Sequence, residues 1–420
     1  MKVLLLNQCF WPDVVATSQQ LTALARALAE RGHHVTVIAG RRGYDDPQMR
    51  FPRRERWEEI EIVRLPTIAL GKTRRWRRFL TFGSFYVECA LRLAITSRHD
   101  VVVSLTSPPL ISWLASMFTR IRGGRSISWV MDLNPDEAIA AGWLRKDSIA
   151  AKLLGSLLES SMHQADKIVV LDRLMKDRFI AKRIAEMKIM VIPPFTDDAV
   201  KYDAEGRAAF RRAHNLAGKF VVMHAGNHSP CHRLDTLLEA ACQLREQKNI
   251  VFCFVGGGSE FRRVGEYAED NRLQNTLCLP YQPQVELSAL LSAADLHTVV
   301  MGDAFPGIIH PSKIYNILAT GLPFLYIGPT DSHMGDIVAK LSGSRIARQA
   351  LHGEVDKVAR YIVSCMESLE EAPEARVATA LAQQFSKATL LPKLINEIEV
   401  GESRAIPQPA VTELAQTIPD

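Results

Sequence analysis

The sequence is poor in cysteine and has no long apolar run and no internal repeat. Its seven cysteines among 420 residues are scattered, and none forms a Cys-x-x-Cys pair. This pattern argues against a disulfide framework or a structural zinc site and favours a reducing compartment. The apolar run at residues 3–6 is too short for the core of a signal peptide. The apolar-leaning stretch 79–96 contains Glu88 and Arg92, so we do not expect it to span a membrane.

Charge is distributed unevenly along the chain. The formal net charge is +5, but residues 1–195 contain 30 Lys and Arg against 19 Asp and Glu, whereas residues 196–420 contain 21 against 27. A basic half joined to an acidic half predicts two domains that face different partners. Hydrophobic residues make up 47% of the chain and charged residues 23%, which is typical of globular proteins and excludes a mostly disordered one.

Short apolar runs alternate with helical patterns in both halves. The expected strands of the first half are 3–6, 35–39, 60–65, 101–105, 127–131, 168–171 and 189–192. Those of the second half are 220–225, 251–255, 276–279, 296–300 and 323–327. Thr17 and Gln20 predict a capping box at the start of the first helix. Strands that are apolar on both faces indicate parallel sheets covered by helices on both sides.

We therefore expect an α/β chain of two doubly wound, Rossmann-like domains that face a central cleft. The linker is predicted at Pro193 and Pro194. The first domain would span 1–195 and the second 196–385, with 386–400 packing back on the first domain and 401–420 forming a flexible tail. In such folds ligands bind beyond the carboxyl ends of the strands, so the loops at these ends are the candidate site.

Three glycines, Gly256, Gly257 and Gly258, close one expected strand and open a helix. Glycines at this place let a ligand approach the backbone, and the helix start favours an anion. The dinucleotide-binding spacing Gly-x-Gly-x-x-Gly is not met, because Phe261 occupies the third position. A tight turn without a ligand is the alternative.

The loop from residue 224 to 235 is dense in hydrogen-bond donors, and it also joins a strand to a helix. The donors suit a phosphate group; they come from His224, Gly226, Asn227, His228, His232 and Arg233. The alternatives are a plain polar loop and a metal site at His228 and His232, which Pro230 disfavours because it would interrupt a common helix.

A third loop precedes the segment 313–320, which we expect to be helical. Pro311 and Ser312 are favourable first-turn residues, and Gly321 with Pro323 ends the helix. The free N–H groups near Ser312, together with the ammonium of Lys313, predict a second anion site. A solvated surface lysine is the alternative.

Residues 72–79 contain five cations and no acid. The run comprises Lys72, Arg74, Arg75, Trp76, Arg77, Arg78 and Phe79, and Arg120, Arg122 and Arg125 add further positive charge. Cations beside aromatic residues suit anionic lipid headgroups. We expect a cytoplasmic protein that binds the cytoplasmic face of the inner membrane. Nucleic acid is disfavoured because no nucleic-acid-binding module is present; a solvated face without a partner is the other alternative.

Taken together, these segments resemble one family over roughly residues 1–400. The opening with Phe10-Trp11-Pro12-Asp13, the segment from Trp129 to Asp136, Ala293-Ala294-Asp295 and the segment 311–323 are similar to the family-4 retaining glycosyltransferases of the GT-B fold. The similarity is to the branch that builds colanic acid, O-antigen and other exopolysaccharides. It implies transfer from a UDP- or GDP-linked sugar to a polyprenyl-diphosphate-linked saccharide, with retention and without a metal or other cofactor.

The resemblance also assigns roles to residues. It implies that the donor diphosphate is bound by Gly226, Asn227, His232, Arg233, Ser312 and Lys313. Asn316 would hydrogen-bond the ribose. The other candidates for the ribose and base follow from their places at strand ends: Gly256 and Gly257 after the strand 251–255, and Tyr281 and Gln282 after the strand 276–279. Asp132 and His310 are the candidate catalytic residues, and Ala16, Thr17 and Ser18 replace the glycine pair of the family's first loop, near donor and acceptor.

The sequence departs from the family at the two glutamates that lie eight positions apart. These positions hold Ile308 and Asn316. Asn316 can still hydrogen-bond a ribose hydroxyl, whereas Ile308 cannot act on a sugar. Two further functions therefore stay open: a binding or partner subunit that keeps the fold without catalysis, and a sugar-nucleotide 2-epimerase on the same fold.

Overall fold

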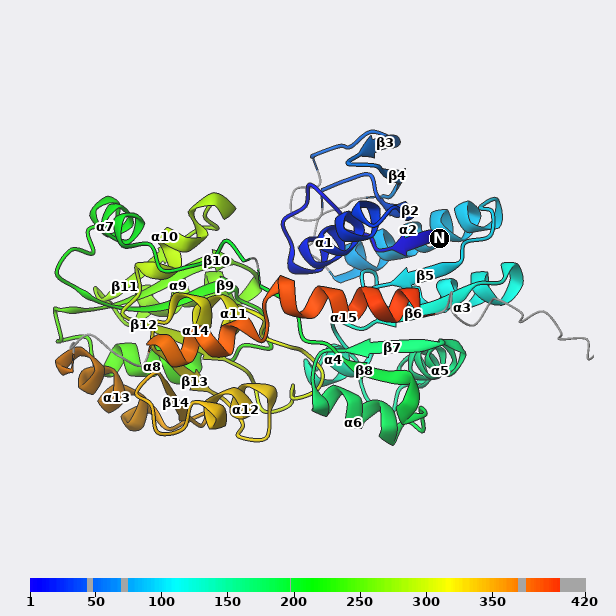
Figure 1. Cartoon of the computed structure of the whole chain (residues 1–420). Coiled ribbons are helices and arrows are strands. Elements are labelled where there is room, and N and C mark those ends of the chain that lie inside the picture. The colour runs from blue at the N-terminus through cyan, green and yellow to red at the C-terminus, as the bar shows by residue number, and fades with distance from the viewer. Residues whose placement is uncertain (44–47, 69–74, 197, 369–374, 401–420) are drawn as a thin grey trace, which may run out of the picture.

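The computed structural model describes residues 1–43, 48–68, 75–196, 198–368 and 375–400. It contains two parallel β-sheets with helices on both faces, side by side in one molecule (Figure 1). The expectation of two doubly wound halves is confirmed. Within the described ranges, no helix combines the length and the apolar composition that crossing a membrane requires.

The first sheet has eight strands in the order β3-β4-β2-β1-β5-β6-β7-β8. All neighbouring pairs are parallel except β3 and β4, which are antiparallel at one edge. The strands are β1 (Lys2–Leu6), β2 (His34–Gly40), β3 (Arg54–Trp57), β4 (Ile60–Leu65), β5 (Val101–Ser104), β6 (Arg125–Trp129), β7 (Lys167–Val170) and β8 (Ile189–Val191). The helices between them are α1 (Ala16–Glu30), α2 (Arg75–Ala94), α3 (Ile111–Arg122), α4 (Asp136–Ala140), α5 (Ile149–Gln164) and α6 (Arg173–Ala181), with the 3-10 turn Glu186–Lys188.

The alternation of side chains along the strands builds two apolar layers. Val3 and Leu5 of β1 point to the layer that holds Leu21 of α1, whereas Leu4 and Leu6 point to the layer formed by α2 and α3. This period-two pattern is what a strand buried on both faces requires.

The second sheet has six parallel strands in the order β11-β10-β9-β12-β13-β14. They are β9 (Phe220–Asn227), β10 (Ile250–Gly257), β11 (Thr276–Leu279), β12 (Leu296–Val300), β13 (Phe324–Ile327) and β14 (Ala347–Ala350). The helices are α7 (Ala204–Ala213), α8 (Asp235–Gln243), α9 (Ser259–Asp270), α10 (Leu287–Ser292), α11 (Lys313–Thr320), α12 (His333–Lys340), α13 (Val355–Glu367), α14 (Ala375–Gln383) and α15 (Lys387–Glu399), with the 3-10 turn Gln284–Glu286.

The last two helices connect the halves. Helix α14 packs against α11 in the second half, and α15 lies along the first half (Figure 1). Glu399 of α15 bonds Arg31 at 2.8 Å and His33 at 2.9 Å, both at the end of α1. The end of the described chain is therefore tied to its beginning.

Two local expectations differ from the structure. Strands β3 and β14 were not expected, because their short sequences lack a run of β-branched residues. The capping box at Thr17 and Gln20 is wrong, since α1 begins at Ala16 with Val15 at the N-cap and no side-chain cap. The Gln20 amide instead donates to the Phe195 carbonyl at 2.7 Å and accepts from the Phe195 N–H at 3.2 Å.

Candidate functional site

Lys313 lies at the point where the strand order of the second sheet reverses, between β9 and β12. It is the first residue of α11, and its Nζ lies 3.0 Å from Nε2 of His224 on β9. A Cβ added to Gly226 would lie 3.4 Å from Lys313 Cε, so the lysine side chain runs across the end of β9. Reversal points of this kind are the usual ligand sites of open α/β sheets.

The ring of His224 has a defined orientation. Its Nδ1 lies 3.1 Å from Oγ1 of Thr298, which itself donates to the Met223 carbonyl at 3.3 Å. Thr298 Oγ1 therefore accepts from His224 Nδ1–H, which leaves Nε2 to accept from Lys313. Burial, followed by the nearby charge of Lys313, lowers the pKa of His224 well below its usual range. The imidazole is neutral and holds the ammonium by one hydrogen bond.

The site carries a cation without a compensating anion. Burial lowers the pKa of Lys313 from 10.5 to about 7. Burial and then the charge of Lys313 lower the pKa of His228 to about 4 and that of His232 to about 3. In the part of the chain that the structure describes, no carboxylate lies within ion-pair distance of Lys313. Because a buried charge is costly without a partner, the arrangement favours a bound anion.

The loop after β9 folds over this cation. His228 Nδ1 lies 2.9 Å from the Gly226 carbonyl, and its buried Nε2 has no hydrogen-bond partner. The rings of His224 and His232 lie 6.3 Å apart. Asn227 is exposed, and Arg233 turns outward, with a 60% exposed side chain 3.8 Å from Asp235. The structure thus brings Gly226, His232 and Lys313 together, and Arg233 does not join them.

The alternative of a metal site at His228 and His232 finds no support in the geometry. Among the residues that the structure describes, the ligand atoms of one group of side chains converge closely enough for an ion, namely Asp172, His310 and His333. His228 and His232 are not part of that group.

The glycines at the end of β10 and at the start of α9 are required mainly by packing. A Cβ on Gly256 would lie 2.0 Å from the Gly226 carbonyl oxygen, and one on Gly258 would lie 2.4 Å from the His228 carbonyl oxygen. Gly257 differs, because a Cβ there would meet the ring of Tyr281 at 2.8 Å. Tyr281 is 58% exposed, so its ring and the backbone at Gly257 offer a flat surface beside the donor loops. Gln282 bonds the Pro280 carbonyl.

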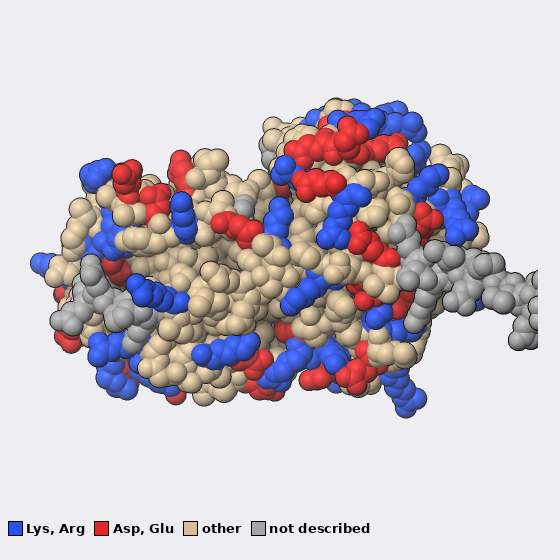
Figure 2. Space-filling view, viewed as in Figure 1, with Lys and Arg blue, Asp and Glu red and all other residues tan. Residues whose placement is uncertain are grey.

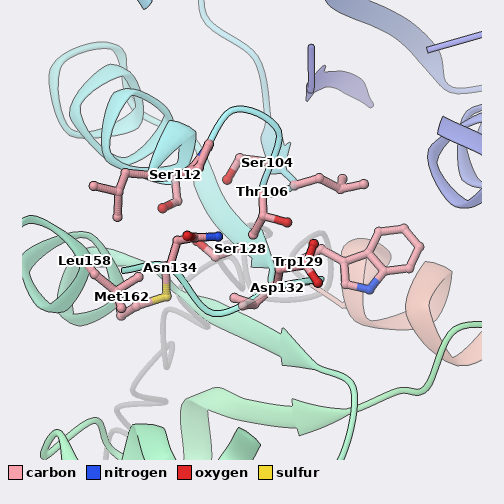
Figure 3. Close-up of a pocket in the computed structure, with 13 residues that line it drawn as sticks. Ser104, Thr106, Ser112, Ser128, Trp129, Asp132, Asn134, Leu158 and Met162 are labelled. Atoms are coloured by element: carbon pink, nitrogen blue, oxygen red, sulfur yellow. The ribbon is translucent and has the colours of Figure 1, made fainter. Parts of the chain in front are cut away.

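Asp132 lies in the first half, just after β6. It lines a small pocket with Ser104, Thr106, Ser128 and Asn134 (Figure 3). Burial, followed by the charges of Glu137 and Asp132, raises the pKa of Cys231 to about 12. Since Cys231 belongs to the loop after β9, the Asp132 carboxylate lies near this loop.

His310 has an environment that does not fit the catalytic role predicted for it. Its Nδ1 bonds Asp172 at 2.9 Å, its Nε2 bonds the Tyr315 hydroxyl at 2.5 Å, and its side chain is 1% exposed. Because both ring nitrogens are hydrogen-bonded within the protein and the side chain has almost no solvent access, the ring cannot contact a bound sugar. Ile308, two residues earlier, is 3% exposed in the core between the halves.

The remaining predicted residues lie on helices. Ala16, Thr17 and Ser18 form the first turn of α1 instead of a loop, and the Ser18 hydroxyl is buried without a partner. Ser312 is the N-cap residue of α11, with no side-chain cap bond, and Asn316 follows Lys313 by one turn of the same helix.

The basic run falls largely beyond the described side chains. Arg74 lies outside the described residues, and Arg75, Trp76, Arg77 and Arg78 begin α2 without described side chains. On the face shown in Figure 2, basic side chains gather at the upper edge of the first half, with acidic ones beside them. An apolar row that was not predicted from the sequence runs along α2 and just past its end, where Leu80, Val87, Leu91 and Ile95 are 49–75% exposed. Their spacing of seven, four and four residues was the available signal.

Two family models match the chain, one in each half. Residues 16–194 match the glycosyl transferase 4-like domain, and residues 206–304 match the glycosyl transferases group 1. WcaI of Escherichia coli K12, named as a colanic acid biosynthesis glycosyl transferase, is 23% identical over 413 residues, which cover 95% of this chain and 100% of WcaI. WbjE of Pseudomonas aeruginosa, named as a glycosyltransferase, is 28% identical over 256 residues, which cover 57% of this chain and 60% of WbjE.

Solved structures of the same architecture span nearly the whole chain. Sucrose-phosphate synthase from Thermosynechococcus elongatus has a TM-score of 0.73 at 15% identity, over 96% of this chain and all of that one. Anabaena HepE in complex with UDP has a TM-score of 0.67 at 15% identity, over 95% of this chain and all of that one. WaaG, described as a glycosyltransferase of lipopolysaccharide biosynthesis, has a TM-score of 0.69 at 17% identity, over 94% and 99% of the two chains. These likenesses establish the GT-B fold.

Proposed function

Because the chain belongs to the glycosyltransferases of the GT-B fold that join a 4-like domain to a group 1 domain, we propose that it transfers a sugar from a UDP- or GDP-linked donor to a polyprenyl-diphosphate-linked saccharide. The product would serve the assembly of an exopolysaccharide, a capsule or an O-antigen, as the names of WcaI and WaaG suggest. The observation that carries the proposal is Lys313, an uncompensated cation at the reversal point of the second sheet.

The donor diphosphate would bind Lys313 and the free N–H groups at the start of α11. An anion at a helix start meets donors that already point toward it. These groups would stabilise the negative charge of the departing nucleotide, which is the electrostatic work that a metal ion does in other transferases. From the resemblance to the family-4 transferases, we also propose that the reaction is metal-independent and proceeds with retention. The base would lie on the ring of Tyr281 beside Gly257, and the ribose would meet Asn316.

The acceptor would enter from the first half. Asp132 lies near the loop that covers Lys313, and hydroxyl and amide groups line the same small pocket. We propose that the Asp132 carboxylate accepts a hydrogen bond from the attacking hydroxyl group. This orientation role would place the nucleophile near the donor.

The membrane surface would be formed by α2 and the end of α3. Leu91 on α2 is 62% exposed, Ile95 just past the end of α2 is 75% exposed, and Ile121 on α3 is 73% exposed. The two helix ends touch, because Arg122 donates to the Ala94 carbonyl at 2.7 Å. An apolar row beside arginine is suited to the boundary between acyl chains and anionic headgroups. We therefore propose peripheral binding to the cytoplasmic face of the membrane.

Vesicle flotation tests the membrane part. Leu91→Ser and Ile95→Ser together should reduce binding to phosphatidylglycerol vesicles by about tenfold, because two large apolar contacts are lost. Val377→Ser is the matched control, since Val377 is 50% exposed on α14 in the second half. Equal flotation of the three proteins would contradict this surface.

A second candidate function is a binding or partner subunit without catalysis. Ile308 favours it, because this residue stands where the related transferases carry a glutamate and is buried in the core between the halves. The two candidates differ in turnover. A nucleotide would bind in both cases, but a sugar would be transferred in the first case alone.

A transfer assay separates the candidates. The full chain is incubated with radiolabelled UDP- and GDP-sugars and with a lipid extract that contains polyprenyl-diphosphate saccharides. Transfer of label to the lipid phase by the wild type, and its loss in Lys313→Met, would support the transferase. Nucleotide binding without transfer under any combination would favour the partner subunit.

A further inference from the structure

The loop 305–312 of the second half is held by the first half through three hydrogen bonds. Leu133 N–H donates to the Ile308 carbonyl at 2.9 Å, and Arg178 Nε donates to the Pro306 carbonyl at 3.0 Å. The third bond joins His310 Nδ1 to the Asp172 carboxylate at 2.9 Å. We name this loop, with its three partners in the first half, the interdomain clasp.

The closest approach in the clasp occurs at Gly307. Its φ is +68°, and a Cβ at this position would lie 2.7 Å from the carbonyl carbon of Leu174. The loop therefore lies directly on the backbone of α6, and a side chain at residue 307 would separate the two surfaces.

Asp172 and His310 form a buried network in which both carboxylate oxygens of Asp172 and both ring nitrogens of His310 have a partner. Asp172 is the N-cap residue of α6, and one carboxylate oxygen accepts from Met175 N–H at 2.8 Å. The other oxygen accepts from His310 Nδ1–H, so His310 Nε2 accepts from the Tyr315 hydroxyl. The side chains of Asp172 and His310 are 5% and 1% exposed. Burial alone would raise the pKa of Asp172, but the hydrogen bond from His310 outweighs it and lowers this pKa.

A metal ion at this place is disfavoured by the orientation of the rings. The ring centroids of His310 and His333 lie 3.7 Å apart, and the ring planes differ by 18°. An imidazole binds a metal in the plane of its ring, and tetrahedral ligands surround the ion. One ion cannot lie in the planes of two stacked rings, so hydrogen bonding between Asp172 and His310 is the better account.

The clasp leads directly into the anion site. His310 precedes Lys313 by three residues, and Tyr315, which bonds His310, lies in the first turn of α11 with Lys313. The carboxylate of Asp172 in the first half thereby fixes the start of the helix that carries the cation of the second half. We propose that Asp172 and His310 are positioning residues, which place Lys313 and the N-terminus of α11 for the donor diphosphate when the two halves are in contact.

Two variants and a control test this role. Asp172→Asn keeps the N-cap of α6, because asparagine is as good a cap as aspartate, but weakens the bond to His310. His310→Phe keeps a ring beside His333 and removes both hydrogen bonds. Lys176→Ala is the control, since Lys176 lies on the same helix α6 and pairs with Glu186 inside the first half.

The readouts are hydrogen exchange of the amides of 306–316 without ligand, and the affinities for UDP and GDP by calorimetry. Losing a charge-assisted hydrogen bond corresponds to a change of about ten- to hundredfold. We expect exchange at 306–316 to rise by this factor in both variants, nucleotide affinity to fall about tenfold, and the double variant to resemble the single ones. Lys176→Ala should match the wild type.

Three results would overturn the proposal. The first is unchanged exchange at 306–316 in both variants, and the second is a rise that is uniform over the whole chain, as a general loss of stability would give. The third is stabilisation of the wild type, and not of Asp172→Asn, by one equivalent of Zn²⁺, which would indicate a metal site. This proposal rests on the proposed function, because it assumes that Lys313 binds the diphosphate of the sugar donor. If neither nucleotide binds the wild type, that assignment fails, while exchange at 306–316 still decides the clasp.

Discussion

Replacing Lys313 with methionine should stabilise the protein while it impairs nucleotide binding. Methionine keeps an apolar stem of similar length and removes the buried ammonium. The pKa of Lys313 is lowered from 10.5 to about 7, so the folded state binds fewer protons than the unfolded state between these pH values. By linkage the lysine costs about 4 kcal/mol of unfolding free energy at pH 7 and about 1 kcal/mol at pH 9.5.

Part of this increase in unfolding free energy is offset in the Lys313→Met variant. His224 Nε2 accepts its hydrogen bond from Lys313, and without the lysine this buried nitrogen has no donor. An unsatisfied buried acceptor costs about 1–3 kcal/mol. We therefore expect a net stabilisation of about 2 kcal/mol at pH 7, which disappears at pH 9.5 because the cost of the ammonium decreases as the pH rises.

Denaturant titrations at both pH values, together with calorimetry, measure these effects. Affinity for UDP or GDP should fall at least tenfold in Lys313→Met, since a charge-assisted hydrogen bond to the diphosphate is lost. Lys340→Met is the control, because Lys340 is exposed at the end of α12 and its loss should change stability by less than about 0.5 kcal/mol. The reasoning is refuted if Lys313→Met is less stable than the wild type at pH 7 and binds the nucleotides equally well.

Three further predictions concern stability. Burial lowers the pKa of six histidines, most strongly at five of them. Each of these five resists the proton that the unfolded state takes up below pH 6.5, so stability present above pH 6.5 is lost on acidification by about 2 kcal/mol per histidine at pH 5. These five residues are His224, His228, His232, His297 and His333. Circular dichroism should therefore show unfolding above pH 4.5, and a fold that is intact at pH 4 would contradict this. Gly258→Ala should lower the unfolding free energy by about 2–4 kcal/mol in urea titrations, because φ is +120° and the Cβ would meet the His228 carbonyl oxygen. Gly265→Ala, in the interior of α9, is the control and should be neutral or stabilising. Similar unfolding free energies for both variants would contradict the packing argument. Arg64→Met should lower the unfolding free energy by about 3 kcal/mol, since it leaves Glu55 unpaired beside a 2% exposed position; a variant as stable as the wild type would contradict a structural role for that ion pair.

The double α/β architecture could be predicted because its signals are local. Apolar runs such as 3–6 and 101–105 are buried on both faces of the sheet, so nearly every residue of such a strand must be apolar. The edge strands β8 and β11 were predicted from their apolar runs, whereas β3 and β14 escaped prediction because their short sequences carry arginine at positions such as Arg54 and Arg348. Their place in the sheet is set by the neighbouring strand.

The site could be predicted in its outline. Glycines and donors at strand ends pointed to the loops after β9 and β10, and Ser312 with Lys313 pointed to the start of α11. The contact between Lys313 and His224 joins residues 89 positions apart, so its distance and the pKa of the lysine depend on the register of two strands.

His310 shows the limit of assignment by position. Its neighbours in the sequence suggested a role at the donor sugar, but its ring turns to Asp172, which lies 138 residues earlier in the other half. No local sequence pattern predicts such a contact, because the contact forms only when the two halves of the chain pack together. The same holds for Ile308, whose carbonyl bonds Leu133 of the first half.

A crystal structure of the full chain with UDP or GDP would show whether Lys313 binds the donor diphosphate. We expect the diphosphate within hydrogen-bond distance of Lys313 Nζ and of the N–H groups that begin α11, with the base on the ring of Tyr281. A nucleotide bound elsewhere, with Lys313 still bonded to His224 and no phosphate beside it, would rule out this donor site.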